Sequence, residues 1–229
     1  MTDTAVGDHP PAKRSQRTAL AVLGIIAAIA VGFALGFFAR LPLDDGGTET
    51  PGADSVDVGF AQDMSVHHSQ AAEMASIALT QSQDQAVRNL AYDILTTQQN
   101  QIGQMQGWLS LWGQPSLPSG EYMTWMSSDD GQSHDHSTAG GSAQMPGMAS
   151  SAEMSALRQA TGTALDVQFL QLMLRHHQGG LPMMEYAAEY AQTSTVRQLA
   201  QTMVNTQTSE STLMTQMLSE RGATPLPMN

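Results

Sequence analysis

The feature that most constrains this chain is an internal repeat with an offset of 109 residues. The pentapeptide MSVHH at residues 64–68 returns as MLRHH at residues 173–177. Residues 57–109 align with residues 166–218 without a gap, and 18 of the 53 aligned positions are identical. Because the repeat contains histidine pairs as well as apolar positions, any chemistry that these residues carry is duplicated together with the architecture.

Apolar residues in both copies recur at three- and four-residue steps, which is the spacing of one buried helical face. The pattern predicts two helical hairpins, at residues 55–112 and 151–221. Neither hairpin can enclose a core alone, so we expect an all-α fold in which they pack as an up-down four-helix bundle. Residues 113–150, which are rich in Ser, Gly and Asp, form the linker between the hairpins.

An N-terminal membrane anchor is predicted at residues 19–39, an uncharged and mostly apolar run long enough to cross a bilayer as a helix. Basic residues within the cytoplasmic tail, residues 1–18, place the rest of the chain outside, at the cell surface or in the periplasm. The run is longer than the apolar region of a cleaved signal peptide, so we expect it to be retained. Residues 40–54 then form a tether and residues 222–229 a short tail.

The extracytoplasmic part is acidic, with 19 Asp and Glu residues against five Arg and no Lys beyond Arg40. This charge repels nucleic acid and anionic lipid, so the only membrane contact that we expect is the anchor. The chain has no cysteine, which excludes disulfides and thiolate metal sites. A GxxxG motif at Gly32 and Gly36 would allow a homodimer in the membrane, and a copper-exchange protein would be a second kind of partner.

Soft metal donors share one face of a helix in each repeat. At about 100° per residue, the two Met and two His of one repeat fall within one third of the helical circumference. Imidazole nitrogen and thioether sulfur suit copper, and thioether favours Cu(I) over hard cations. We therefore predict that copper is bound where the two faces meet, by Met64, His67, His68, Met74, Met173, His176, His177 and Met183.

The linker carries a second group of the same donors. His134, His136, Met145 and Met148 lie on a Gly- and Ser-rich segment. We interpret them as a flexible strand that captures copper transiently, since such capture needs no ordered ligands. An ordinary solvated loop is the alternative.

Other functions have less support. A di-iron bundle would use Glu-x-x-His motifs, yet no Glu precedes a bundle His by three residues. No Gly-rich phosphate loop and no Ser nucleophile with a convincing partner are present, so an enzyme is not expected. A copper-dependent redox enzyme stays open, as does a metal-free module whose Met-rich surface binds partner helices. Any single Met could also simply fill the core.

The motif F-x3-M-x2-H-H-x5-M, which begins at Phe60 and again at Phe169, resembles domain-of-unknown-function family 305. The resemblance covers about residues 55–221. It implies an exported or anchored, ferritin-like helical bundle, and an association with copper binding and tolerance in some members. It also implies that Asp57 and Asp166 belong with the metal donors already named.

The resemblance also implies that the two halves are not equivalent. Glu210 matches an acidic residue that the family usually has in the later helix of the repeat, whereas Gln101 does not. Gly180 stands where the family usually has Ala after the His pair. We therefore expect the two halves to bind metal unequally, or only one of them to bind it.

Overall fold

The computed structural model describes residues 50–126 and 141–229. Four long helices dominate this part of the chain: α2 (Val56–Gln81), α3 (Gln85–Leu111), α5 (Gly162–Tyr190) and α6 (Ser194–Glu220). A 3-10 turn, η1 (Thr124–Met126), and a short helix, α4 (Ser151–Gln159), lie in the connection between α3 and α5. Apart from one isolated bridge between Tyr122 and Ser142, the regular structure of these residues is helical, which confirms the predicted all-α class.

Short polar side chains set the hairpin turns. Ser55 caps α2 by accepting a hydrogen bond from the backbone N–H of Val58, and Asp84 caps α3 in the same way. Thr193 caps α6. Because only three residues separate α2 from α3, and α5 from α6, each pair of helices must turn back on itself as an antiparallel hairpin.

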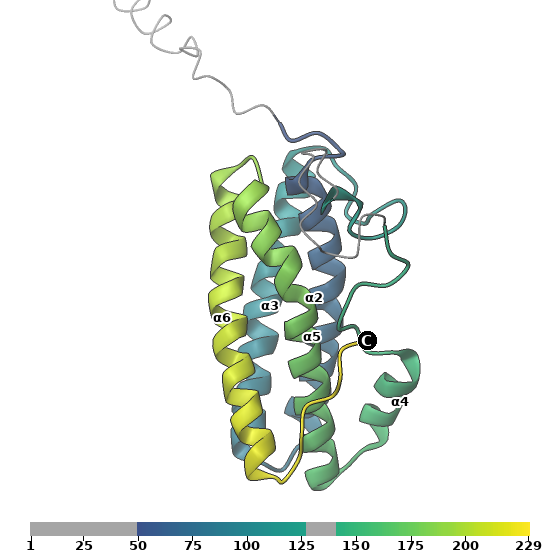
Figure 1. The fold of residues 1–229 in the computed structure, drawn as a ribbon, viewed down its shortest axis with the longest axis vertical. Coiled ribbons are helices and arrows are strands. Elements are labelled where there is room, and N and C mark those ends of the chain that lie inside the picture. The colour runs from purple at the N-terminus through teal and green to yellow at the C-terminus, as the bar shows by residue number, and fades with distance from the viewer. Residues whose placement is uncertain (1–49, 127–140) are drawn as a thin grey trace, which may run out of the picture. The chain divides into compact units, whose positions relative to one another are not determined.

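The connection between the hairpins changes the expected topology. It follows α2 from its first turns toward its end: the N–H of Met123 donates to the Asp63 carboxylate at 2.7 Å, and further along Arg158 pairs with Glu73. The chain thus returns to the end of the bundle where α2 finished, and α5 runs parallel to α3 (Figure 1). The simple up-down order predicted from the sequence is therefore wrong. A single long crossover between two hairpins is the ferritin-like arrangement.

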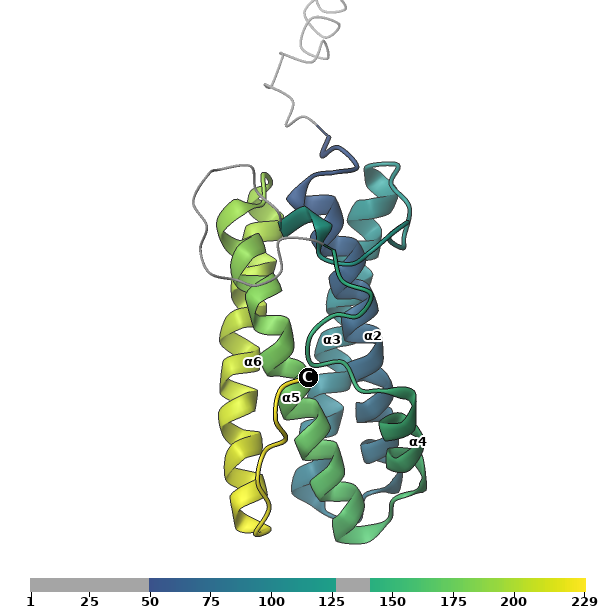
Figure 2. The ribbon, with the colours of Figure 1, turned by 45° about the vertical axis from the view of Figure 1, so that its right-hand side comes forward.

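The two hairpins pack side by side through α2 and α5 (Figure 2). Their core divides into two apolar clusters. Cluster A includes Met74, Ile94, Met173 and Met214, and cluster B includes Met64, Met105, Met183 and Met203. On each long helix the two clusters are separated by about two to three turns whose buried residues are mainly polar, and both histidine pairs lie in these intervals.

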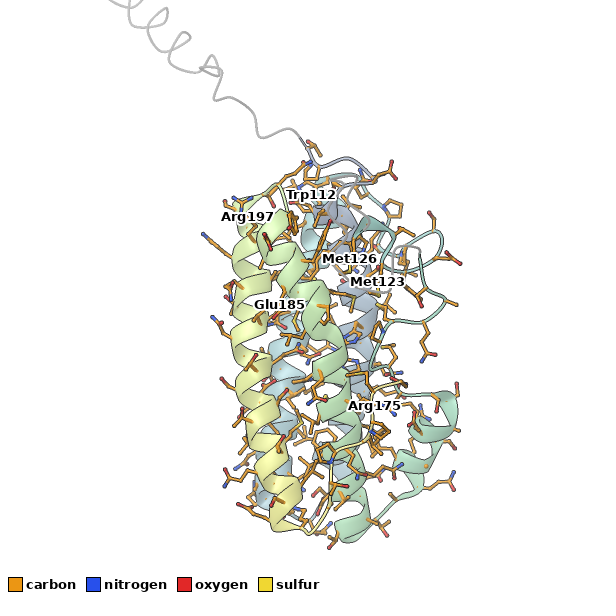
Figure 3. The ribbon with its side chains drawn as sticks, in the orientation of Figure 1. Trp112, Met123, Met126, Arg175, Glu185 and Arg197 are labelled. Atoms are coloured by element: carbon orange, nitrogen blue, oxygen red, sulfur yellow. The ribbon has the colours of Figure 1, made fainter. Side chains whose placement is uncertain are left out.

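Short helix α4 is held against the bundle by charge. Arg175, labelled in Figure 3, extends from α5, and its guanidinium donates to the Glu153 carboxylate at 2.9 Å. The guanidinium keeps the pKa of Glu153 low, at about 2, with a further contribution from hydrogen bonds donated by Ser150. Ser150 and Glu153 also form a reciprocal capping box at the start of α4.

The predicted cytoplasmic tail, the anchor at residues 19–39 and most of the tether lie outside the described residues. Among residues 50–126 and 141–229, no helix is long and apolar enough to span a membrane.

Candidate metal centre

The predicted donors of the two repeats are all in the core. Their helical spacing turns one face of α2 toward the matching face of α5, and burial of that face is complete. None of these eight side chains exposes more than 1% of its surface: Met64, His67, His68, Met74, Met173, His176, His177 and Met183. The metal-free module that would use a Met-rich surface is therefore not supported, because these methionines offer no surface to a partner.

The centre of the site is a stacked pair of imidazoles, one from each repeat. The ring centroids of His67 and His176 lie 3.8 Å apart, with 34° between the ring planes. The second ring of each pair lies further out, with centroids 6.5 Å apart for His67 and His68 and 6.4 Å for His176 and His177. Since α2 and α5 are antiparallel, the two repeats meet here about an approximate two-fold axis.

Backbone carbonyls fix the protonation of the inner imidazoles. Nε2 of His67 donates to the Pro146 carbonyl at 3.3 Å, and Nε2 of His176 donates to the carbonyl of His67 at 3.1 Å. A carbonyl can only accept, so the proton of each neutral ring is on Nε2. The lone pair is therefore on Nδ1 of both rings.

The outer imidazoles are oriented by side chains at matched positions of the repeat. Nε2 of His68 donates to Oε1 of Gln101 at 2.8 Å, and Nε2 of His177 donates to Oε2 of Glu210 at 2.7 Å. A carboxylate partner makes the opposite ring nitrogen a stronger ligand than an amide partner does. The two halves are thus chemically unequal in the way that the sequence predicted for Gln101 and Glu210.

All four Nδ1 atoms, in contrast, are buried without a hydrogen-bond partner among the described residues. A buried polar atom that is left unpaired costs about 1–3 kcal/mol of folding free energy. Four such atoms in the histidine layer, which consists of His67, His68, His176 and His177, are a large penalty for a purely structural core. Neutral imidazole, with one nitrogen held by a carbonyl or carboxylate and the other free, is the form that binds metals. The donor set therefore fits a metal ion.

Burial favours the neutral form of three of the rings, His67, His68 and His176. Desolvation lowers the pKa of His67 from 6.5 to about 4, against the opposing effect of the Pro146 carbonyl. Desolvation, followed by repulsion from His67, lowers the pKa of His68 to about 3. The pKa of His176 is lowered well below 6.5 for the same two reasons. These three imidazoles need not lose a proton before they bind a cation at neutral pH.

Because α2 and α5 are antiparallel, each apolar cluster contains methionines from both repeats. Each repeat carries its own Met-His-His-Met series, but Met64 shares cluster B with Met183, whereas Met74 shares cluster A with Met173. The histidine layer therefore has thioethers from both repeats on each side. No group of three or more His, Asp or Glu side chains in residues 50–126 and 141–229 is arranged to hold a metal ion.

The predicted flexible strand is wrong for Met145 and Met148, which pack against the bundle, whereas their role as copper donors stays a prediction. Met145 is 2% exposed and belongs to cluster B, and Met148 packs against the same cluster. Between them, Gly147 has a φ of +78°, and a Cβ there would lie 2.5 Å from the carbonyl oxygen of Arg175. The segment at residues 145–149 thus covers the histidine layer closely. His134 and His136 lie outside the described residues.

Asp57 and Asp166 have a different environment from the predicted metal donors. The Asp57 carboxylate accepts hydrogen bonds from the backbone N–H groups of Gln192 and Thr193, at 2.7 and 2.9 Å, in the turn before α6. Asp166 accepts a hydrogen bond from the Ser82 hydroxyl at 2.5 Å, in the turn before α3. Each carboxylate, at the start of its own hairpin, therefore stabilises the turn of the other.

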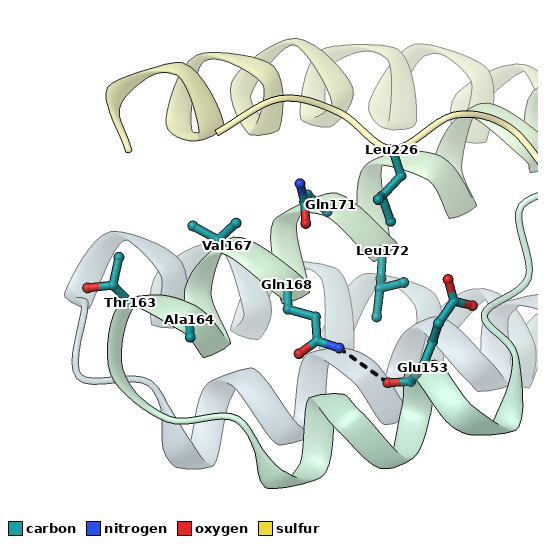
Figure 4. Close-up of a pocket in the computed structure, with 8 residues that line it drawn as sticks. All are labelled: Glu153, Thr163, Ala164, Val167, Gln168, Gln171, Leu172 and Leu226. Atoms are coloured by element: carbon teal, nitrogen blue, oxygen red, sulfur yellow. Dashed lines mark hydrogen bonds between the residues drawn. The ribbon is translucent and has the colours of Figure 1, made fainter. Parts of the chain in front are cut away.

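The sequence did not identify Pro146, Gln98 or Gln207 as part of this layer. A backbone carbonyl leaves no sequence signal. The glutamines do leave a sequence signal, because Gln98 and Gln207 occupy the same position of the repeat on a helical face that is otherwise mostly apolar. A groove of about 540 Å³ between α4, α5 and the C-terminal segment lies elsewhere, and the residues that line it include no histidine or methionine (Figure 4).

These features define a class: an all-helical bundle of two duplicated hairpins around a buried layer of histidine and methionine. The chain belongs to the family described as domain of unknown function DUF305, whose model matches residues 57–218. The resemblance inferred from the repeated motif is thereby confirmed.

Solved structures agree with this assignment. A DUF305 protein of Streptomyces coelicolor, described as a candidate secreted protein, is 44% identical, with a TM-score of 0.68 over 77% of this chain and 99% of its own. A DUF305 fragment from Deinococcus radiodurans is 34% identical, with a TM-score of 0.57 over 72% of this chain and 96% of its own. CopM in its Cu(I)-bound form has the same fold at 21% identity, with a TM-score of 0.54 over 72% and 96%. No curated protein sequence matches the chain.

Proposed function

We propose that this protein binds copper, with Cu(I) as the favoured ion, and serves in copper buffering or tolerance. The observation that carries the proposal is the set of four buried Nδ1 atoms that have no hydrogen-bond partner among the described residues, while every Nε2 is hydrogen-bonded. Folding has oriented four imidazole lone pairs in one layer. A metal ion bound to these nitrogens would compensate for their burial.

The surrounding methionines favour Cu(I) among possible metals. Thioether sulfur is a soft, uncharged donor, and it binds Cu(I) without losing a proton. Met64, Met74, Met173 and Met183 line both sides of the histidine layer within the apolar clusters. An uncharged donor set in an apolar core suits a singly charged ion better than a doubly charged one, because desolvation of the ion costs less.

Storage fits the site better than turnover does. The four imidazoles are at most 1% exposed, and the segment at residues 145–149 covers them. A redox enzyme needs an open coordination position that its substrate can reach. A buried ion released by movement of the covering segment would be exchanged slowly, which is the behaviour of a buffer.

Solved relatives are compatible with this reading. CopM has been crystallised in Cu(I)-bound, Cu(II)-bound and Ag-bound forms. At 20–21% identity that likeness concerns the fold, so the donors of this chain carry the argument. We further propose that His134 and His136 deliver copper to the bundle.

We propose an extracytoplasmic location, with the apolar run at residues 19–39 as the membrane anchor. Basic residues before the run and an acidic, cysteine-free sequence after it support this orientation. A copper-exchange protein is the partner that a buffer requires, and a homodimer through Gly32 and Gly36 remains part of the proposal.

The direct test is a titration of the full-length protein with Cu(I) against a chromogenic chelator. The matched variant carries His67→Gln, His68→Gln, His176→Gln and His177→Gln. Glutamine keeps a donor near the Nε2 position and removes Nδ1, so the helical circular dichroism should be unchanged while tight binding is lost. A second variant, His134→Gln with His136→Gln, should bind copper as tightly as the wild type but load more slowly. Equal Cu(I) affinity of the wild type and the four-histidine variant would refute the proposal.

A further inference from the structure

The unpaired polar atoms of the core are concentrated in one place. Eight buried side-chain nitrogen or oxygen atoms in the described residues have no hydrogen-bond partner, and seven of them belong to only six residues. These six residues form three pairs related by the 109-residue repeat: His67 and His176, His68 and His177, and Gln98 and Gln207. The proposed function accounts for the histidines, and it leaves the glutamines unexplained.

Both glutamines are buried next to the histidine layer. Gln98 is 2% exposed and Gln207 is 4% exposed. Each lies three residues before the side chain that orients an outer imidazole, Gln101 in the first repeat and Glu210 in the second. A separation of three residues puts both side chains on the same helical face, one turn apart.

Small residues stand opposite the glutamines. His68 of α2 is hydrogen-bonded to Gln101 of α3, and the two helices are antiparallel. Gln98, three residues before Gln101, should therefore lie level with Ala71, three residues after His68. In the second repeat the equivalent position is Gly180, where an added Cβ would lie 2.9 Å from Cε1 of His67. By this register the two glutamines lie level with small residues of the facing helices, Ala71 in α2 and Gly180 in α5.

An amide is a poor choice for filling such a position. Leucine has a similar volume and no polar atoms to satisfy, and the rest of the same stripe of α3 uses Leu90, Ile94 and Met105. Within the part of the chain that the structure describes, Nε2 and Oε1 of Gln98 have no hydrogen-bond partner, and neither does Oε1 of Gln207. A carboxamide both donates and accepts, so it can hold a ligand that carries oxygen and hydrogen.

We propose that Gln98 and Gln207 hold the oxygen ligand, a water or hydroxide, of a Cu(II) ion bound to the neighbouring imidazoles. This inference rests on the proposed function and extends it to a second oxidation state. Cu(II) takes nitrogen and oxygen ligands in tetragonal sites, whereas Cu(I) and Ag(I) are satisfied by imidazole and thioether. The glutamines thus raise the affinity of the site for Cu(II), and the methionines raise its affinity for Cu(I).

The test compares Cu(II) with Ag(I), a redox-inert ion of the same charge as Cu(I), in the full-length variant Gln98→Leu with Gln207→Leu. The Cu(II) dissociation constant should rise about tenfold or more, the usual effect of losing a hydrogen-bonding partner of a bound ligand. The Ag(I) dissociation constant should stay within about twofold. The electron paramagnetic resonance spectrum of bound Cu(II) should change as well. The Tm of the metal-free protein should increase, because unpaired amides have been removed.

Two outcomes would overturn this inference. Unchanged Cu(II) and Ag(I) constants would mean that the glutamines serve the metal-free core, and equal weakening of both ions would mean general disruption. Gln104→Leu, an exposed change on α3, is the matched control. The two single variants replace the double one if it does not fold. If the wild type bound neither ion, the proposed function itself would be refuted. If the wild type bound both ions and the variant kept the same constants, only the role of the glutamines would be refuted.

Discussion

Acidification should destabilise the metal-free protein through its buried histidines. Burial lowers the pKa of His67 from 6.5 to about 4 and that of His68 to about 3. The unfolded chain therefore takes up protons at these sites below pH 6.5, while the folded chain does not. Their contribution to stability is complete above pH 6.5 and is lost as the pH falls toward the folded values.

The size of this effect follows from the two pKa values. At about pH 5, protonation of each unfolded histidine favours unfolding by about 2 kcal/mol, since each pH unit below 6.5 is worth about 1.4 kcal/mol. His67 and His68 together should then cost about 4 kcal/mol, which for a domain of this size lowers Tm by about 10 °C.

The assay is urea unfolding, followed by far-UV circular dichroism in the presence of a chelator, at about pH 7.5 and about pH 5. The comparison protein carries His67→Gln and His68→Gln, which do not titrate and keep a donor near Nε2. The wild type should lose about 4 kcal/mol more than the variant between the two conditions. Equal losses would show that these imidazoles are solvated or already charged in the folded protein, contrary to the reasoning from burial.

Three further predictions concern individual residues. Glu210→Gln should weaken copper binding about 10–100-fold, and Gln101→Glu should strengthen it. The reason is that a carboxylate partner raises the basicity of the opposite imidazole nitrogen. Competition titrations measure the copper affinity of both variants. Gly147→Ala should displace the covering segment and speed copper release in stopped-flow exchange, whereas Gly52→Ala, which meets no neighbour, should not. Asp57→Ala should destabilise the protein by about 2–4 kcal/mol in urea unfolding, by leaving N–H groups in the α6 turn unpaired, with copper stoichiometry unchanged.

The sequence predicted the helices and the buried donor face well because both depend on local periodicity. The spacing of Met64, His67, His68 and Met74 identifies one side of a helix without knowledge of the partner helix. The repeat then indicated that a second, equivalent face exists at residues 166–190. The histidines are indeed buried together, with His67 stacked on His176.

The direction of α5 and the role of the linker could not be predicted in the same way. Both depend on contacts between residues far apart in sequence, such as Pro146 with His67 and Arg158 with Glu73. A Gly- and Ser-rich composition indicates a flexible segment, yet the lack of side chains at Gly147 and Gly179 is what allows that segment to lie close against α5. Small residues here permit close packing as well as flexibility.

Each hairpin stabilises the turn of the other through an aspartate, and this has a consequence for assembly. Asp57 binds the turn before α6, and Asp166 binds the turn before α3. A single hairpin would have one aspartate with no turn to stabilise and one turn with no aspartate. Two identical copies of such a hairpin would satisfy each other, as a symmetric dimer whose stability would depend on protein concentration. Joining both copies in one chain makes the encounter intramolecular, at an effective concentration in the millimolar range. The bundle can therefore stay assembled at any cellular abundance, and its two halves are free to diverge, as Gln101 and Glu210 have done.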